Sequence, residues 1–367
     1  MNRHILYRIF LFLLVAFLLV ETVEAQRNRY KRRRSKSKNI SNYRGGIVGG
    51  KFRPYHFVGA GINALNYFGD LAPVNRAAST DISFTRPGFG VMYGYRFHPN
   101  ISFRANYNWG RLRGDDATAD FDQEENQGRY WRNLSFRNDI HELYVGVELF
   151  LFPEYNGPSY RSPFNIYLFV GGGVFSHTPK GKVPQYDYQT LGPTPSDAAE
   201  TLPEAGEWVN LRDLGTEGQN LDLEGVPEPY SRIEYNVPVA IGAHMRLPGN
   251  FNVGIELGYR FIFTDYLDDV SGTYVDYREF GEDNLSRIMA DRSAEPIAVV
   301  SETERNIDGL VTVRNGEYNT IGALGAGTDG AIRGNPDNND MYFVTQIRLT
   351  YILPKNLFGY RRRAKFR

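Results

Sequence analysis

Apolar and polar side chains alternate with a period of two in eight segments of this chain. In residues 100–112 the odd positions from Ile101 to Trp109 are apolar, whereas the even positions from Ser102 to Gly110 hold Arg104, two asparagines, a serine and a glycine. Successive side chains of a β-strand point to opposite faces, so this period predicts strands. The eight segments are residues 55–64, 88–97, 100–112, 138–152, 164–175, 232–246, 251–263 and 341–353.

The connections between these segments alternate in length. Three are short, at residues 98–100, 153–163 and 247–250, and four are long, at residues 65–87, 113–137, 176–231 and 264–340. Short turns at one end and long loops at the other are typical of outer-membrane barrels. We therefore predict an all-β protein, an antiparallel transmembrane up-and-down β-barrel of eight strands. Its long loops would be extracellular, and its short turns and both chain ends periplasmic.

Two long loops bear on this prediction. Asn315-Gly316 is a typical hairpin turn, which leaves open an extra hairpin outside the membrane or a total of ten strands. The loop 176–231 is rich in Pro, Asp and Glu, and we expect it to be polar and poorly structured.

The polar face of the predicted strands is rich in glycine and carries opposite charges. An eight-stranded lumen is only wide enough to be filled by side chains, and small residues with paired Arg and Glu suit that space. The apolar face would be a very large patch in water, whereas lipid accommodates it. We therefore prefer a barrel in outer-membrane lipid to a soluble, lipocalin-like barrel, and a plugged lumen to a diffusion pore. The predicted lumen charge network comprises Arg96, Arg104, Glu148, Glu234, Glu256, Arg260 and Arg348.

The N-terminus has the pattern of a secretory signal peptide. Arg3 and Arg8 precede the apolar run 9–20, and Ala25 is a small residue at a suitable cleavage position. We predict export to the cell outer membrane with cleavage near Ala25; an uncleaved anchor helix is the alternative. The expected organisation is a signal peptide (1–25), a basic disordered periplasmic segment (26–53), the barrel (54–353) and a basic tail (354–367).

Basic residues cluster on both sides of the predicted barrel. Residues 27–38 contain eight basic residues in twelve, while the whole chain has a formal net charge of zero, which favours no nucleic-acid partner. The clusters are either simply solvated or form docking sites for an acidic periplasmic partner, and residues 27–38 could instead contact lipid phosphates. The candidate docking residues are Arg32, Arg33, Arg34, Arg361, Arg362 and Arg363.

Few residues of the sequence indicate catalysis or metal binding. The chain has no cysteine, which excludes disulfides, thiol nucleophiles and cysteine metal sites. Asp265, Asp268 and Asp269, with Asp70, could coordinate Ca²⁺, but such residues more often form turn hydrogen bonds. His177 next to Ser176 could belong to an enzyme site at the rim, although a polar interface residue is the simpler interpretation. We therefore predict no enzyme, no metal and no cofactor.

Two segments carry a resemblance to a known family. Residues 67–71 (YFGDL) and 263–274 (FTDYLDDVSGTY) resemble the PorG-like outer-membrane barrels of the Bacteroidota. The residues that carry it are Asp70, Thr264, Asp265, Tyr266, Asp268, Asp269, Ser271, Gly272 and Tyr274.

That family includes a component of the type IX secretion and gliding machinery, associated with its periplasmic ring, and paralogues without an assigned role. The resemblance implies no catalytic residues. It implies a non-enzymatic barrel that anchors or organises a type IX complex, with secretion-ring subunits as partners. The alternative is an adhesin or ligand-binding barrel that acts through its long loops.

Overall fold

The computed structural model describes residues 52–71, 86–118, 127–154, 161–281, 284–307, 311–314, 317–320 and 329–354. The predicted signal peptide and both basic clusters lie outside the described residues, so the statements made about them above stay predictions.

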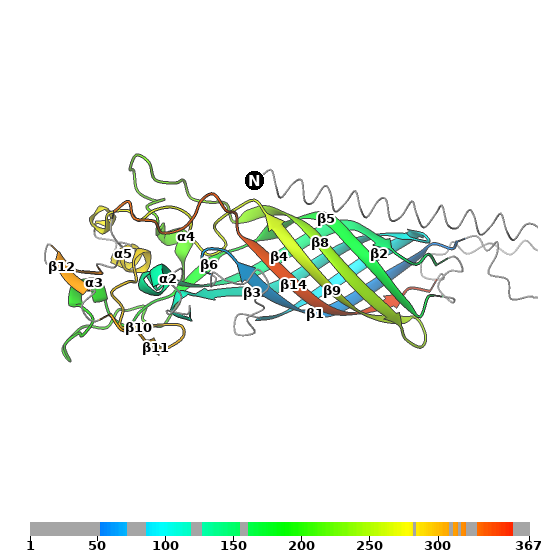
Figure 1. Ribbon diagram of the computed structural model, residues 1–367, viewed down its shortest axis with the longest axis horizontal. Helices are drawn as coiled ribbons and strands as arrows, with labels where there is room; N and C mark the ends of the chain where they lie inside the picture. The colour runs from blue at the N-terminus through cyan, green and yellow to red at the C-terminus, as the bar shows by residue number, and fades with distance from the viewer. Residues whose placement is uncertain are drawn as a thin grey trace, which may run out of the picture.

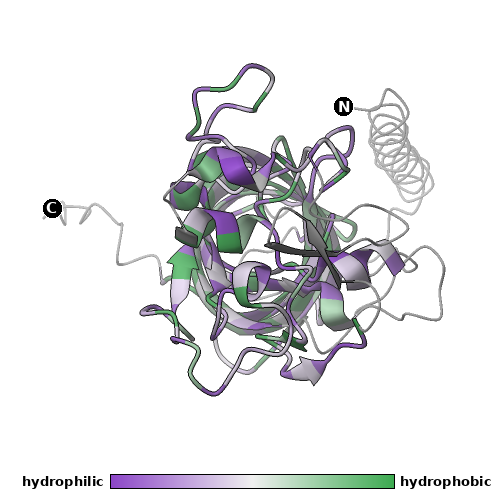
Figure 2. Cartoon of the chain, turned by 90° about the vertical axis from the view of Figure 1, so that its left-hand side faces the viewer, coloured by the Kyte–Doolittle hydropathy of each residue, from purple (hydrophilic) through white to green (hydrophobic). Residues whose placement is uncertain are grey.

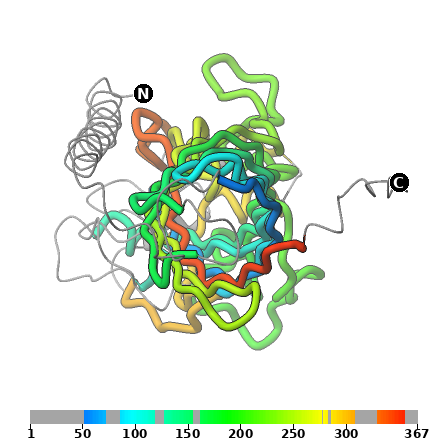
Figure 3. Tube along the Cα trace, turned by 90° about the vertical axis from the view of Figure 1, so that its right-hand side faces the viewer, coloured from blue at the N-terminus to red at the C-terminus, as the bar shows by residue number. Residues whose placement is uncertain are grey.

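Eight long strands close into an antiparallel barrel, as the sequence predicts (Figures 1 and 3). Closure is made by the first and last strands, which pair from Phe57 opposite Ile352 to Phe68 opposite Met341. The strands are β1 (Tyr55–Phe68), β2 (Arg86–His98), β3 (Ile101–Asp115), β4 (Ser135–Phe150), β5 (Phe164–Ser176), β8 (Ile233–Arg246), β9 (Phe251–Ile262) and β14 (Met341–Ile352). The short strands β12 (Val311–Arg314) and β13 (Glu317–Thr320) pair with each other in a separate sheet, so the hairpin adds nothing to the barrel.

The two faces of the barrel wall have opposite character. Large apolar side chains such as Ile62, Leu143 and Ile255 are exposed on the outside, whereas Arg104 and Glu148 are fully buried inside. In water this exterior would be a large apolar patch, but it matches the hydrocarbon of a bilayer. The closed strand ladder also satisfies the backbone hydrogen bonds, which hydrocarbon requires. The barrel is therefore of the outer-membrane type.

Glycines on the inner face make room for large rings. A Cβ at Gly94 would lie 2.0 Å from the Phe57 ring, and one at Gly242 would lie 2.0 Å from the Tyr167 hydroxyl. Aromatic side chains of one strand therefore fill the space left by glycines of the next, and the lumen is packed with side chains.

The short turns lie at one end of the barrel, which by the rule for outer-membrane barrels is periplasmic. Figure 3 looks into this end, where the strands form a ring. The first strand, β1, begins at this end and the last strand, β14, ends there beside it. The Leu353 N–H, just after β14, donates to the His56 carbonyl of β1.

The long loops fold into a cap over the other end (Figures 1 and 2). We call the described parts of residues 69–85, 116–134, 177–232 and 263–340 the outer cap. Its elements are η1 (Asp116–Thr118), α2 (Gln127–Arg132), β6 (Pro179–Lys182), α3 (Tyr188–Leu191), β7 (Trp208–Asn210), α4 (Leu211–Leu214), η4 (Tyr277–Phe280), α5 (Asn284–Ala290), β10 (Ile297–Ala298) and β11 (Thr303–Glu304), besides β12 and β13. None of the helices in the described residues is long and apolar enough to cross a membrane.

The expectation of a poorly structured loop at 176–231 is wrong. β6 extends the barrel sheet by pairing with β4, and β7 pairs with β6. The physical reason is that the loop buries apolar side chains: Val183 and Leu211 belong to the same core as Leu112 and Phe136 of the barrel wall. This core continues from the barrel mouth into the cap, so barrel and cap pack as one unit.

Candidate functional site

Four charged side chains cross the middle of the lumen in alternating order. The Arg104 guanidinium contacts Glu148 at 2.9 Å and Glu256 at 2.8 Å. Arg348 contacts the same two carboxylates at 3.0 and 3.1 Å. Tyr167 adds a hydroxyl that donates to Glu256 at 2.7 Å. Two positive and two negative groups make this layer neutral, which offsets the desolvation of each charge.

Two further ion pairs lie on either side of this middle layer. Towards the outer cap, Arg260 contacts Glu142 at 2.7 Å, and Asn236 donates to the same carboxylate at 2.6 Å. Towards the periplasmic end, Arg96 contacts Glu154 at 3.1 Å. Each layer carries one positive and one negative group, so the lumen is occupied by neutral sets of charges along its length.

The described structure brings six of the seven predicted lumen residues into ion pairs. Glu234 is the exception, because it lies near the outer end of β8, is partly exposed, and has no ion pair within the described residues. Glu142 and Glu154 take part instead. Glu142 stands on the same face as Glu148 and could have been found from the period of two. Glu154 follows the end of β4, so the strand pattern does not include it.

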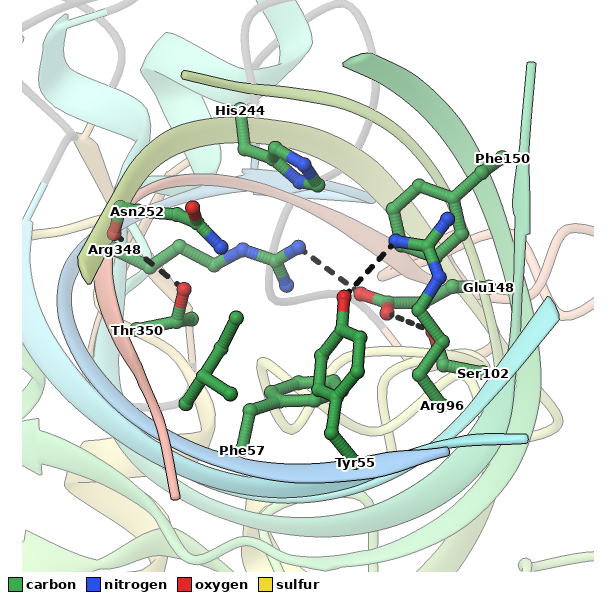
Figure 4. A pocket seen from close by; sticks show the side chains of 11 residues that line it. Tyr55, Phe57, Arg96, Ser102, Glu148, Phe150, His244, Asn252, Arg348 and Thr350 are labelled. Carbon is green, nitrogen blue, oxygen red and sulfur yellow. Dashed lines mark hydrogen bonds and ion pairs between the residues drawn. The ribbon is translucent and has the colours of Figure 1, made fainter. Parts of the chain in front are cut away.

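A cavity opens between the middle layer and the periplasmic rim (Figure 4). It holds about 310 Å³ of space, including the part open to solvent, and is bounded by Arg348 and Glu148 on its inner side. Tyr55, Phe57 and His244 form part of its wall. The cavity ends at the charged layer, so it is a shallow vestibule and does not continue through the barrel.

The segment that resembles the PorG-like family lies over the barrel mouth. Leu267 and Val270 are fully buried in the core shared by barrel and cap. The Asn138 side chain of β4 donates to the Leu267 carbonyl at 2.7 Å, and Asp340, just before β14, accepts from the Leu267 N–H at 2.9 Å. This segment therefore seals the outer end of the lumen with apolar side chains and ties the cap to several strands.

Asp268 of this segment is held by the first long loop. Its Oδ2 accepts from the Tyr67 hydroxyl at 2.5 Å and from the Leu71 N–H at 3.1 Å, and its Oδ1 accepts from the Val270 N–H at 3.0 Å. The Tyr67 hydroxyl also lies 2.9 Å from Asp340 Oδ1. The two resembling segments, 67–71 and 263–274, are thus in direct contact.

Asp269 contacts a different set of residues from Asp268. It has a positive φ of 70°, and its carboxylate accepts hydrogen bonds from Thr216 and, at 2.6 Å, from the Tyr230 hydroxyl. Arg333 donates to the Asp269 carbonyl at 2.6 Å. Burial raises the pKa of Asp269 to about 6, against the opposing effect of Arg333.

Glu217 anchors the turn that follows. Its carboxylate accepts from the Ser271 N–H at 2.9 Å and the Gly272 N–H at 3.1 Å, and it pairs with Arg333 at 2.9 Å. Tyr266 contributes a ring that stacks on Tyr230 with centroids 4.6 Å apart. The loop 177–232 is therefore fastened to the family-like segment by the buried Glu217, by one aromatic stack and by the hydroxyl groups that bind Asp269.

The remaining residues of the family-like set have backbone or packing roles. The Thr264 hydroxyl accepts from the Tyr266 N–H at 3.2 Å. Tyr274 is buried and its N–H donates to the Ala331 carbonyl at 2.9 Å. Asp70 accepts from the Asn335 N–H at 2.7 Å, and Arg132 donates to its carbonyl at 2.8 Å.

Asp265 differs from its neighbours. Its side chain is only 7% exposed, and neither carboxyl oxygen has a hydrogen-bond partner within the described residues. Burial raises the pKa of Asp265 to about 8, with Asp70 and Asp268 adding to the effect and Ser271 opposing it. Burial likewise raises the pKa of Asp268 to about 7.

The aspartates do not form the Ca²⁺ site considered from the sequence. Asp269 is bound to Thr216, Tyr230 and Arg333, away from Asp268. Across the part of the chain that the structure describes, no three His, Asp or Glu side chains are arranged to hold a metal ion. Turn and loop anchoring is the role that these contacts support.

His177 lies just after β5 as a buried ring. Its Nε2 is 2.9 Å from the Ser231 carbonyl, and the ring stacks on Tyr230 with centroids 5.8 Å apart. Burial lowers the pKa of His177 to about 4. These contacts are those of a neutral packed histidine, and none of them joins it to a serine hydroxyl.

Comparison with known proteins gives a partial family match and similarities of fold. A family model described as "Domain of unknown function (DUF6089)" matches residues 53–181, from β1 into β6. None of the curated proteins compared with this chain matches it. The chain is similar to solved outer-membrane proteins in fold alone.

Three solved structures illustrate that similarity. Neisserial surface protein A is 9% identical, with 81% of this chain and 96% of that chain covered and a TM-score of 0.33. Ail, the attachment invasion locus protein of Yersinia pestis, is 8% identical, with coverages of 82% and 100% and a TM-score of 0.32. The outer membrane protein OprG of Pseudomonas aeruginosa is 9% identical, with coverages of 84% and 99% and a TM-score of 0.35.

Proposed function

We propose that this chain is a non-enzymatic, PorG-like barrel of the outer membrane that anchors or organises a type IX secretion complex. One observation carries the proposal: the barrel is filled with charged layers, yet both ends of the described chain leave from adjacent strands at the periplasmic rim. A plugged barrel acts through its ends and surfaces. The basic segments 27–38 and 361–367 precede β1 and follow β14 in the sequence, which suits docking on an acidic periplasmic partner.

The docking step can be tested by changing charge while keeping length. A tagged full-length chain is purified from outer membranes in mild detergent and its co-purifying proteins are identified. We expect ring subunits of the secretion machinery with the wild type, and their loss when Arg32, Arg33, Arg34 and Arg361 to Arg363 are all changed to Gln. The Arg→Lys set is the matched control and should retain the partners, with binding that weakens as salt rises.

Two results would contradict the proposal. Recovery of the same partners with the Gln set would exclude the tails as the docking site. A barrel recovered without any periplasmic protein, in wild type and variants alike, would exclude the scaffold role.

The ordered outer cap favours a second candidate function, binding of a surface ligand. Residues 183–230 contain ten acidic residues and a single basic one, Arg212. Seven of the acidic side chains are exposed: Asp197, Glu200, Glu207, Asp213, Asp222, Glu224 and Glu228. An ordered, acidic outward surface suits a cationic ligand. Changing these residues to Asn or Gln should abolish salt-sensitive binding of a lysine-rich peptide and spare secretion; unchanged binding would exclude this candidate.

A further inference from the structure

Three buried aspartates and a partly buried one lie close together where the outer cap joins the barrel. We call Asp70, Asp265, Asp268 and Asp340, with the Tyr67 hydroxyl, the junction cluster. All five side chains except the partly buried Asp70 are at most 7% exposed. They come from the end of β1 and the loop after it, from the family-like segment, and from the residue before β14. The cluster therefore joins three parts of the chain that hold the cap on the barrel.

The charged groups around the junction cluster leave it short of positive charge. Arg132 and Arg129 of α2 act on the Asp70 carboxyl without an ion pair, and Arg132 also acts on Asp268. Asp116 adds negative charge near Asp70, and Glu217 adds negative charge near Asp265. The Arg132 guanidinium is committed to Asp116 at 2.8 Å. Among the described residues, no Lys or Arg nitrogen is within ion-pair distance of the four carboxylates. Charge pairing, which neutralises the lumen, is absent from this part of the structure.

The hydrogen bonds at Tyr67 indicate where a proton lies. The hydroxyl has one proton but lies 2.5 Å from Asp268 Oδ2 and 2.9 Å from Asp340 Oδ1, so one carboxyl must donate if both contacts are hydrogen bonds. Asp268 is surrounded by donors, since two backbone N–H groups also bind it. Asp340 Oδ2 accepts from the Leu267 N–H, which leaves Oδ1 as the atom that carries the proton. The chain of donation then runs from Asp340 to Tyr67 to Asp268.

Asp265 requires neutralisation for a second, independent reason. Its carboxyl is almost fully buried and has no hydrogen-bond partner within the described residues. An ionised carboxylate in that position would lose its hydration with only the nearby Ser271 side chain to replace it, and such groups take up a proton instead.

We propose that the junction cluster is a proton-binding site that couples the docking of the outer cap to pH. Asp340 and Asp265 hold protons while the cap is docked, and loss of these protons at alkaline pH loosens the cap from the barrel mouth. The direction of the pKa shifts agrees: burial and Asp268 raise the pKa of Asp340 well above its ordinary value, and burial raises that of Asp265 to about 8.

The sign of the effect follows from linkage. An aspartate in an undocked, solvated loop has a pKa of about 3.9. The docked cap therefore binds more protons than the undocked cap between about pH 4 and the raised values, which reach about 8 for Asp265. The contribution to docking is complete below about pH 4 and is lost as pH rises towards about 8. The inference is independent of the proposed secretion role.

The test measures amide hydrogen exchange of the full chain in lipid vesicles from about pH 5 to about pH 9. Each rate is divided by its intrinsic rate at the same pH, which removes the chemical pH dependence. We expect the protection of the amides of residues 264–274 to fall as pH rises, while β5 and β8 stay protected. The fall should be about tenfold per pH unit for each carboxyl that is protonated in the docked cap and ionised in the undocked cap. The double variant Asp265→Asn, Asp340→Asn carries uncharged side chains at both positions at every pH and should keep more protection than the wild type at about pH 9.

Two controls isolate the cluster. Asp222→Asn removes an exposed carboxylate of the cap and should follow the wild-type pH profile. Asp265→Asn alone removes a carboxyl that makes no hydrogen bond, so it should fold even where Asp340→Asn does not, and it should flatten the profile in part.

Three outcomes would overturn the proposal: a wild-type cap whose protection is independent of pH, a double variant that loses protection as the wild type does, or control by a metal. The last is recognised if about 1 mM Ca²⁺ restores protection at alkaline pH and a chelator removes it at neutral pH.

Discussion

The lumen and the junction cluster bury the same kind of acidic side chain in two different ways. In the lumen, Glu148 and Glu256 each contact two guanidinium groups, and every layer of charge is neutral. In the junction cluster, Asp268 and Asp340 share a tyrosine hydroxyl and have backbone donors instead of cations. The ion pairs of the lumen arginines persist at any ordinary pH, whereas the protons of the junction cluster are lost at alkaline pH. The barrel is therefore plugged at any ordinary pH, whereas the attachment of its cap depends on pH.

The largest expected effect comes from breaking the middle layer of the lumen. Arg104→Met leaves Glu148 and Glu256 with Arg348 as their only cation, so one buried negative charge is uncompensated. We expect the free energy of unfolding to fall by about 3–5 kcal/mol, measured by urea unfolding in vesicles. Adding Glu256→Met leaves a neutral Arg348–Glu148 pair, and the double variant should recover stability relative to the single one.

A matched control lies on the outside of the same two strands. Arg111 and Asp139 form an ion pair across β3 and β4 at 2.6 Å, with side chains 34% and 31% exposed. Solvent screens this pair, so changing Arg111 to Met should cost less than about 1 kcal/mol. Equal losses for the Arg104 and Arg111 variants would show that the lumen charges are solvated and that the barrel is not plugged.

A smaller effect is expected at Glu217, one of several side chains that anchor the cap. Glu217→Gln weakens the bonds to Arg333 and to the Ser271 and Gly272 N–H groups. We expect the docking of loop 177–232 to weaken by about 1.5–3 kcal/mol, the range for hydrogen bonds to charged groups, with barrel unfolding unchanged. Limited proteolysis of the loop provides the measurement, with the exposed Glu228→Gln as the control. A cap that stays resistant in both variants would refute the anchoring role.

The strands and the inner face were predictable because both follow from a local rule. A period of two shows which residues share a face, as it does for Arg104 of β3 and Glu148 of β4, and the alternation of loop lengths indicates which end is periplasmic. Glu234 obeys the same period, yet its position near the end of β8 leaves it partly exposed and outside the ion pairs. The period of two predicts the face on which a side chain lies. It does not predict whether charged partners lie at the same level of the barrel.

The outer cap was not predictable in the same way, because its contacts join residues far apart in the chain. Glu217 reaches Arg333, and Tyr67 reaches Asp268 and Asp340, across distances in sequence that carry no repeated pattern. The acidic loop 176–231 looked unstructured because its few apolar residues have no period of their own. They pack only once the barrel mouth is formed beneath them.

The eight-stranded wall follows from the amino-acid pattern alone, because hydrocarbon outside and a narrow lumen inside impose a strict alternation on every strand. How the buried charges are neutralised is visible only in the folded molecule. Closure of the barrel places Arg104 between Glu148 and Glu256, and docking of the cap places Asp340 and Asp268 on one hydroxyl. Neutralisation depends on distances of a few ångströms between segments that only folding brings together.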